Sequence, residues 1–309
     1  MPSIKRFKPS DHSLHGVRIL SVALNLPGPA ALMRLADMGA TCTKFEPLPP
    51  DGSPQGSPSD PMGMYAPHAY AQLHAGIKVL QADLKSSAGQ TKLHALLAKS
   101  DVLLTSFRPS ALRKLGMDWS TLNTQLPALN MVSIVGAKGT AAEIPGHDLT
   151  YLAAHGLVNG LELPATLFAD MAGSALAVEA VLKALIQRNR MGRGQGKGVF
   201  QEVALEDAAA YLALPRHWGL TLQQGSVGGA HAGYAVYACI NGRVAVAALE
   251  PHFASQLLTV AGISSAENTH QTMMKPATRE ALCRFFAGLT RRQIDLLAVT
   301  HDLPLLSLP

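Results

Sequence analysis

Short apolar runs alternate with helical patterns along the first two thirds of the chain. Runs rich in Val, Ile and Leu predict buried strands at 17–22, 41–46, 77–85, 101–107, 130–136 and 199–205. Apolar residues at i, i+3 and i+4 predict helices at 30–38, 87–100, 110–115, 120–126, 149–161, 171–188 and 206–214. This alternation indicates right-handed crossovers and a mostly parallel α/β sheet, which binds ligands outside the carboxyl ends of its strands.

Turn and capping residues mark several element boundaries. Gly39 is placed to stop the first helix, and Asp170 is the expected N-cap of the helix at 171–188. Residues 1–16 are typical of a polar arm, and residues 188–198 predict a basic, Gly-rich turn. Residues 47–63 are so dense in Pro, Gly and Ser that they predict a loop, and a long loop inside a compact domain is often functional.

The pattern changes from about Gly225. Residues 234–249 predict an antiparallel hairpin with Asn241-Gly242 as its turn, and helical pieces are expected from there to Pro309. We therefore expect a large α/β lobe over 1–215 and a smaller α+β lobe over 225–309.

Composition narrows the class of protein. The 309 residues are 48% apolar and 15% charged, which is typical of a compact α/β protein. The net charge of +5 is ordinary for this length, although it also suits an anionic ligand, and we expect no nucleic-acid partner. Three separated cysteines, no secretory h-region and no run of about 18 apolar residues predict a cytoplasmic protein with reduced thiols and no membrane span.

Few standard motifs are present. The chain lacks GxGxxG, Walker A, HExxH and GxSxG, and its twelve histidines show no metal-ligand spacing, so we expect no metal. His147 opens a helix where ligands of a parallel sheet bind, but it is also compatible with a capping histidine. Asp170 is equally compatible with a simple helix cap, and Glu250 with a solvated carboxylate after an apolar strand.

Several motifs in order resemble the superfamily of α-methylacyl-CoA racemases and family III CoA transferases, which includes the L-carnitine dehydratase and bile-acid-inducible protein F-like proteins. They are LHGVRIL, LPGPAALMRLADMGATCTKFEP, FRPSALRKLGMDW, PGHDLTYLA, FADMAGSALAVEAVLKAL, GRGQGKGVFQEVAL and GGAHAGYAVYACINGRVAVAALEPHF. Their order and spacing match over nearly the whole chain. The resemblance implies a Rossmann-like large lobe, a smaller lobe, an interlocked homodimer, and an active site between the large lobe of one chain and the small lobe of the other.

The resemblance also implies site residues. In the racemase branch His147 and Asp170 match the acid/base pair, with Glu250 and Tyr234 close to the same site. Arg108 matches an arginine near the nucleotide of coenzyme A, which is the acyl carrier of the substrate. We expect Lys78 and Lys44 to supply further cationic contacts to it, and backbone N–H groups at the start of the helix near Asp170 to stabilise an enolate oxygen.

The chain departs from the family pattern in four places. Ala75 stands where relatives carry an arginine, so Lys78 is expected to replace one phosphate contact as a point charge. The segment GAKGTAAEI lacks the usual loop signature before GHD, and Ala172-Gly173-Ser174 replaces a triple glycine, which is expected to narrow the approach of a thioester. The chain ends at HDLPLLSLP, so the C-terminal return segment of relatives is expected to be absent.

Three functional hypotheses follow. The first is racemase-like transfer of the α-proton of a 2-methylacyl-CoA or similar thioester, which His147 and the LEP segment favour. The second is a CoA transferase in which Asp170 is the nucleophile and His147 is not required. The third is a relative that has kept the fold and lost catalysis.

Overall fold

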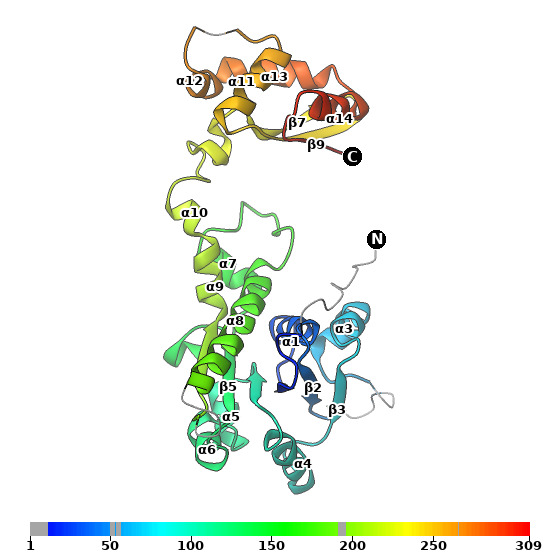
Figure 1. Cartoon of the computed structure of the whole chain (residues 1–309), viewed down its shortest axis with the longest axis vertical. Helices are drawn as coiled ribbons and strands as arrows, with labels where there is room; N and C mark the ends of the chain where they lie inside the picture. The colour runs from blue at the N-terminus through cyan, green and yellow to red at the C-terminus, as the bar shows by residue number, and fades with distance from the viewer. Residues whose placement is uncertain (1–11, 50–52, 54–56, 191–195, 265) are drawn as a thin grey trace. The chain divides into compact units, whose positions relative to one another are not determined.

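A computed structural model describes residues 12–49, 53, 57–190, 196–264 and 266–309 (Figure 1). The polar arm expected at 1–16, the loop expected at 47–63 and the turn expected at 188–198 therefore lie partly outside the described residues. The chain divides into two compact units, Met1–Leu212 and Ala213–Pro309. Each unit has a sheet of its own.

The first unit contains a six-stranded parallel sheet in the order β3-β2-β1-β4-β5-β6. Its strands are β1 (Arg18–Ser21), β2 (Thr41–Glu46), β3 (Lys78–Gln81), β4 (Val102–Thr105), β5 (Asn130–Val135) and β6 (Phe200–Ala204). This is the strand order of doubly wound dinucleotide-binding folds. The predicted α/β class and parallel sheet are confirmed, and the strand expected at 77–85 is shorter than predicted.

Helices cover both faces of this sheet. They are α1 (Pro27–Asp37), α2 (Pro61–Tyr65), α3 (Pro67–Leu73), α4 (Ser87–Leu97), α5 (Pro109–Lys114), α6 (Trp119–Gln125), α7 (Asp148–Ala154), α8 (Phe168–Arg190) and α9 (Leu205–Leu212). Successive strand residues point to opposite faces, so Leu104 packs in the core with α1 and α8, while Leu103 packs in the core with α4, α5 and α6. Burial on both faces explains why the central strands β4 and β5 are largely apolar runs.

The helix expected at 149–161 ends earlier, because α7 closes with a Schellman motif. Gly156 adopts a left-handed φ of 69°, its N–H donates to the carbonyl of Ala153, and the N–H of Leu157 donates to the carbonyl of Leu152. The long helix begins earlier than expected, at Phe168. Asp170 therefore lies inside the first turn of α8, and its prediction as the N-cap is wrong.

The loop expected at 47–63 is wrong over its last residues, where α2 begins. Asp60 caps this helix by accepting the N–H of Met62, and Pro61 occupies its first position. The helix α3 follows after Ala66, in a stretch for which no element was predicted.

The second unit packs helices on a three-stranded antiparallel sheet, β7-β8-β9. Its elements are α10 (Leu214–His217), β7 (Tyr234–Cys239), β8 (Gly242–Ala247), α11 (Pro251–Val260), α12 (Thr269–Met273), α13 (Pro276–Ala287), α14 (Arg291–Thr300) and β9 (Leu305–Leu308). The predicted hairpin is present, but Cys239 pairs with Gly242, so the turn residues are Ile240 and Asn241. The strand β9 falls where only helical pieces were expected.

Candidate active site

A pocket of about 230 Å³ opens at the carboxyl ends of the parallel strands. Its walls come from the segments that follow β1, β4, β5 and β6, together with the starts of α7 and α8. The lining residues are Leu24, Asn25, Pro27, Ser106, Phe107, Arg108, Ile134, Val135, Gly136, Ala142, Ile144, Pro145, Gly146, His147, Tyr151, Asp170 and Leu205. The strand order reverses between β1 and β4, so the pocket lies at the topological switch point, where such sheets bind ligands.

The segments after β1 and β4 are fixed to each other at this pocket. The N–H of Leu24 donates to the hydroxyl of Ser106 over 2.9 Å. Asn25 has a left-handed φ of 62°, and its N–H donates to Asp60 over 3.0 Å. These bonds hold the rim where the two halves of the sheet diverge.

Asp170 is the buried carboxyl group of the pocket, with 8% of its surface exposed. Burial is the main cause that raises its pKa to about 7, and the negative charge of Asp148 raises it further. Near neutral pH this side chain therefore exists in both the acid and the carboxylate form. That is the property a general acid or base needs.

His147 shares the pocket with Asp170 and is exposed to solvent. It occupies the N-cap position of α7. The backbone N–H of His147 donates to the hydroxyl of Thr150 over 3.0 Å, and that hydroxyl donates to the carbonyl of His147 over 2.7 Å. The backbone at the helix start is thus satisfied by Thr150, and the imidazole lines the pocket.

Arg108 lines the same pocket and is exposed. It directly precedes α5, and the first turn of α5 is capped by Glu143 from the segment 137–144. Both carboxylate oxygens of Glu143 accept hydrogen bonds of 2.7 Å from Ser110, one from its N–H and one from its hydroxyl. The segment GAKGTAAEI, although it lacks the family's loop signature, therefore packs on α5 and contributes Ala142 and Ile144 to the pocket wall.

In the segment Ala172-Gly173-Ser174, which stands where relatives have three glycines, the central glycine is kept. A Cβ atom at Gly173 would lie 2.3 Å from Cδ2 of Leu205, a residue of the pocket wall, so α8 and α9 pack closely here. The hydroxyl of Ser174 donates to the carbonyl of Met171 over 2.7 Å, and neither Ala172 nor Ser174 lines the described pocket. The narrowing expected from these two side chains therefore does not fall on the pocket wall.

Three backbone N–H groups at the start of α8 have hydrogen-bond partners. The N–H of Phe168 donates to Thr166 O, that of Asp170 to the carboxylate of Asp148, and that of Met171 to Leu167 O. The stabilisation of an enolate oxygen by backbone N–H groups near Asp170 stays a prediction.

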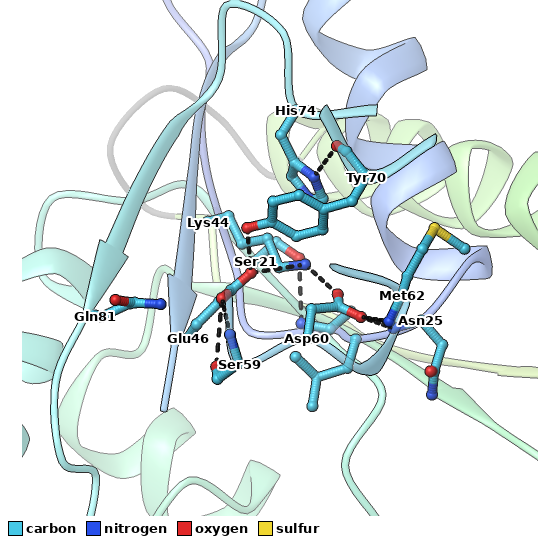
Figure 2. A network of polar contacts seen from close by, with 12 residues as sticks. Ser21, Asn25, Lys44, Glu46, Ser59, Asp60, Met62, Tyr70, His74 and Gln81 are labelled. Atoms are coloured by element: carbon cyan, nitrogen blue, oxygen red, sulfur yellow. Dashed lines mark hydrogen bonds and ion pairs between the residues drawn. The ribbon is translucent and has the colours of Figure 1, made fainter. Parts of the chain in front are cut away.

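Lys44 lies in a buried polar network rather than on the pocket wall (Figure 2). Its fully buried ammonium forms ion pairs with Asp60 and with Glu46, the latter over 3.2 Å. Glu46 also accepts hydrogen bonds from Ser59 and from the hydroxyl of Tyr70, the latter over 2.8 Å. Burial would raise the pKa of Glu46, but the charge of Lys44 and these hydrogen bonds outweigh it and lower that pKa.

The other predicted site residues lie in different places. Lys78 is exposed at the first residue of β3, whereas the pocket lies at the carboxyl ends of the strands. Tyr234 begins β7, and Glu250 occupies the N-cap position of α11, both in the second unit. The structure thus brings His147, Asp170 and Arg108 together, and the roles of Lys78, Lys44, Tyr234 and Glu250 stay predictions.

Two residues were missed as site candidates. Tyr151 lines the pocket, and its hydroxyl oxygen would lie 2.4 and 2.5 Å from Cβ atoms added at Gly136 and Gly146, which explains why both positions are glycine. Asp148 is buried, does not line the pocket, and accepts a hydrogen bond from the backbone N–H of Asp170. The GHD motif drew attention to its histidine, although the neighbouring aspartate was equally visible in the sequence.

The sequence comparisons identify the family. A family model for CoA-transferase family III matches residues 14–306. The chain belongs to CoA-transferase family III. This confirms the resemblance that the motifs suggested.

Named relatives include both branches of the superfamily. The chain is 31% identical over 299 residues to the alpha-methylacyl-CoA racemase of Mus musculus, which covers 91% of this chain and 73% of that protein. It is 36% identical over 149 residues to the cinnamoyl-CoA:phenyllactate CoA-transferase of Clostridium sporogenes, which covers 47% of this chain and 36% of that protein. These relatives are enzymes, so they give no support to a chain that has lost catalysis.

Solved structures share the fold. The hypothetical protein Rv3272 from Mycobacterium tuberculosis matches with a TM-score of 0.77 at 22% identity, over 95% of this chain and 83% of that chain. A CaiB/BaiF family protein from Brucella suis matches with a TM-score of 0.73 at 23% identity, over 96% and 84%. Within the described residues, no group of three or more His, Cys, Asp or Glu side chains could hold a metal ion. No helix in those same residues is long and apolar enough to cross a bilayer.

Proposed function

We propose that this member of CoA-transferase family III transfers the α-proton of an acyl-CoA thioester, in the manner of an α-methylacyl-CoA racemase. The observation that carries the proposal is the pairing, in one pocket, of His147 with a buried Asp170 whose pKa is about 7. Two groups of this kind can exchange a proton with a carbon acid near neutral pH. The substrate class is a 2-methylacyl-CoA or a similar branched thioester.

The chemistry uses both side chains. One group in its basic form removes the α-proton, and the C–H electron pair moves into the thioester carbonyl to give an enolate. The other group, in its acid form, returns a proton to the α-carbon. Return to the opposite face inverts the centre, and neutral His147 with protonated Asp170 is a competent starting state.

The alternative is transfer of CoA between carboxylates, as the name of the Clostridium sporogenes relative describes for that protein. Here the Asp170 carboxylate attacks the thioester carbonyl, which expels the CoA thiolate and forms a mixed anhydride. The thiolate then attacks the aspartyl carbonyl to give an enzyme thioester and release the first carboxylic acid. Burial disfavours the carboxylate form that this first step requires, so the acid/base function is preferred.

CoA recognition and assembly remain part of the proposal. Arg108, at the pocket, is the best-placed cation for a CoA phosphate, and Lys78 is a further candidate. The predicted contact of Lys44 with CoA is not part of the proposal, because its buried ammonium is already paired with Asp60 and Glu46. Tyr234 and Glu250 are proposed to act at the same site in a homodimer. Analytical ultracentrifugation measures the mass of the assembly in solution. A cytoplasmic location stays a prediction that rests on the three separated cysteines.

The test of the function is α-proton exchange. The protein is incubated with a 2-methylacyl-CoA in heavy water, and deuterium at the α-carbon is followed by NMR or mass spectrometry. Exchange that Asp170→Ala abolishes supports acid/base chemistry. Absence of exchange, with CoA binding shown separately by calorimetry, refutes the racemase function for this substrate class.

His147→Ala distinguishes the two activities. If His147 is one of the two acid/base groups, this variant loses about 10²–10⁴-fold in the rate of exchange. A transferase that depends on the Asp170 nucleophile is expected to retain most of its rate. The two rates are measured on the same preparations, one by deuterium uptake and one by transfer of CoA to an added carboxylate, and equal losses in both would contradict this division of roles.

A further inference from the structure

Asp148 is a buried carboxylate that contacts the site without lining the pocket. It begins α7, directly after His147, and only 4% of its surface is exposed. Its Oδ1 atom accepts the backbone N–H of Asp170 over 2.9 Å. One short segment thus carries the candidate histidine and holds the backbone of the candidate aspartate.

This contact changes the surroundings of the Asp170 side chain in two ways. A carboxylate in the first turn of a helix is normally stabilised by the unpaired N–H groups there. Here the N–H of Asp170 itself is taken by Asp148, so it cannot support the anion of its own side chain. The negative charge of Asp148 also repels negative charge on the Asp170 side chain.

We propose that Asp148 is a positioning residue that orients Asp170 and favours its protonated form, so that Asp170 enters the reaction as the acid and His147 as the base. This inference rests on the proposed function and deepens it. The raised pKa of Asp170, which burial and the charge of Asp148 cause in that order, agrees with the geometry.

Other charged and titratable groups face Asp170 from the elements around it. His147 and Tyr151 come from α7, Tyr65 from α2 and Arg108 from the segment after β4, while the charge of Glu206 from α9 acts on Tyr151. Burial and the charge of Asp170 raise the pKa of Tyr151, so this phenol stays neutral at working pH. Unlike these groups, Asp148 accepts a hydrogen bond from the backbone of Asp170.

The experiment compares Asp148→Asn with the unmodified enzyme. Asparagine keeps an oxygen that can accept the N–H of Asp170 and removes the charge. Two quantities are measured between pH 4 and 9: the ¹³C shift of the Asp170 carboxyl, assigned with Asp170→Asn, and the rate of α-proton exchange. Glu179→Gln is the matched control, because Glu179 lies on α8, the helix that carries Asp170, is exposed and pairs with Lys183.

In Asp148→Asn we expect the titration of Asp170 to move down by about one pH unit or more, since a charge a few ångströms away is worth at least that in a partly buried site. The limb of the exchange profile that requires protonated Asp170 should move by the same amount. Glu179→Gln should leave both unchanged.

Two results would overturn the proposal. One is an Asp170 that titrates at the same pH in Asp148→Asn and in the unmodified protein. The other is an Asp170 that already titrates near 4 in the unmodified protein. This result would overturn the proposal even if the variant does not fold. The carboxyl titration needs no turnover, so a shift without α-proton exchange would refute the proposed function while the effect of Asp148 on Asp170 would stand.

Discussion

Asp170→Asn is expected to abolish α-proton exchange and, at the same time, to make the folded chain more stable above pH 7. The loss of activity follows because an amide can neither give nor take the proton, and a general acid or base is worth about 10²–10⁴-fold in rate. A nucleophilic role would be lost as well. This single substitution should thus separate the contribution of the Asp170 carboxyl to catalysis from its unfavourable contribution to the free energy of unfolding.

The gain in stability has a defined pH window. The pKa of Asp170 is near 4 in the unfolded chain and about 7 in the folded one, because burial and the charge of Asp148 disfavour the anion. Between these values the folded state holds a proton that the unfolded state has released, so the free energy of unfolding falls as pH rises through the window. The full cost is present above pH 7, and it is absent below pH 4.

Asparagine does not ionise and escapes this cost. We expect Asp170→Asn to gain about 2–4 kcal/mol in the free energy of unfolding at pH 8 and close to nothing at pH 4. Urea denaturation at both pH values measures the difference. A variant that is inactive but no more stable at pH 8 would show that Asp170 titrates near its ordinary pKa, which would remove the basis for its role as an acid.

The sheet could be predicted from the sequence because its strands are buried on both faces. Runs such as 102–105 and 130–135 are buried throughout and mostly apolar, so the run itself predicts a strand without reference to distant partners. The strand β9 was missed because Leu305–Leu308 is short and gains its pairing only from β8. The end of α7 was missed because the turn depends on the φ of Gly156, which a pattern of apolar residues does not reveal.

The site was predictable only in part, for a similar reason. His147 and Asp170 stand where a parallel sheet places its ligands, and the structure brings them into one pocket. The depth of Asp170 inside α8 and its bond to Asp148 arise from the packing of α7 on α8, which no local signal encodes. Lys44 is an ordinary strand lysine in the sequence, and its partner Asp60 lies beyond a Pro- and Gly-rich stretch, so their contact was not foreseen.

Lys44→Met is expected to destabilise the folded chain severely. The ammonium of Lys44 lies fully buried between Asp60 and Glu46, whose side chains are also fully buried. Methionine keeps most of the volume and removes the charge, which leaves two carboxylates buried without their cation. Breaking a buried ion pair on one side costs about 3–5 kcal/mol.

The same change should reach the pocket through Asp60. This carboxylate holds the N–H groups of Asn25 and Met62, and Asn25 lines the pocket. If Asp60 must protonate or move once Lys44 is gone, the rim after β1 loses a fixed point. We therefore expect the KM for acyl-CoA to rise more than kcat falls, since Lys44 lies off the pocket wall and does not touch the reacting atoms.

Lys183→Met is the matched control for this prediction. Lys183 also forms an ion pair, with Glu179 one helical turn away, but both side chains are more than half exposed. Such surface pairs contribute about 0.3–0.5 kcal/mol. Urea denaturation of the two variants at pH 7 should therefore differ by several kcal/mol, and the double variant Lys44→Met/Glu46→Gln should recover part of the loss because one buried anion is removed. A Lys44→Met variant as stable as Lys183→Met would mean that water reaches this network in solution, and the three charged side chains would then act as a surface cluster rather than as the buried support of the pocket rim.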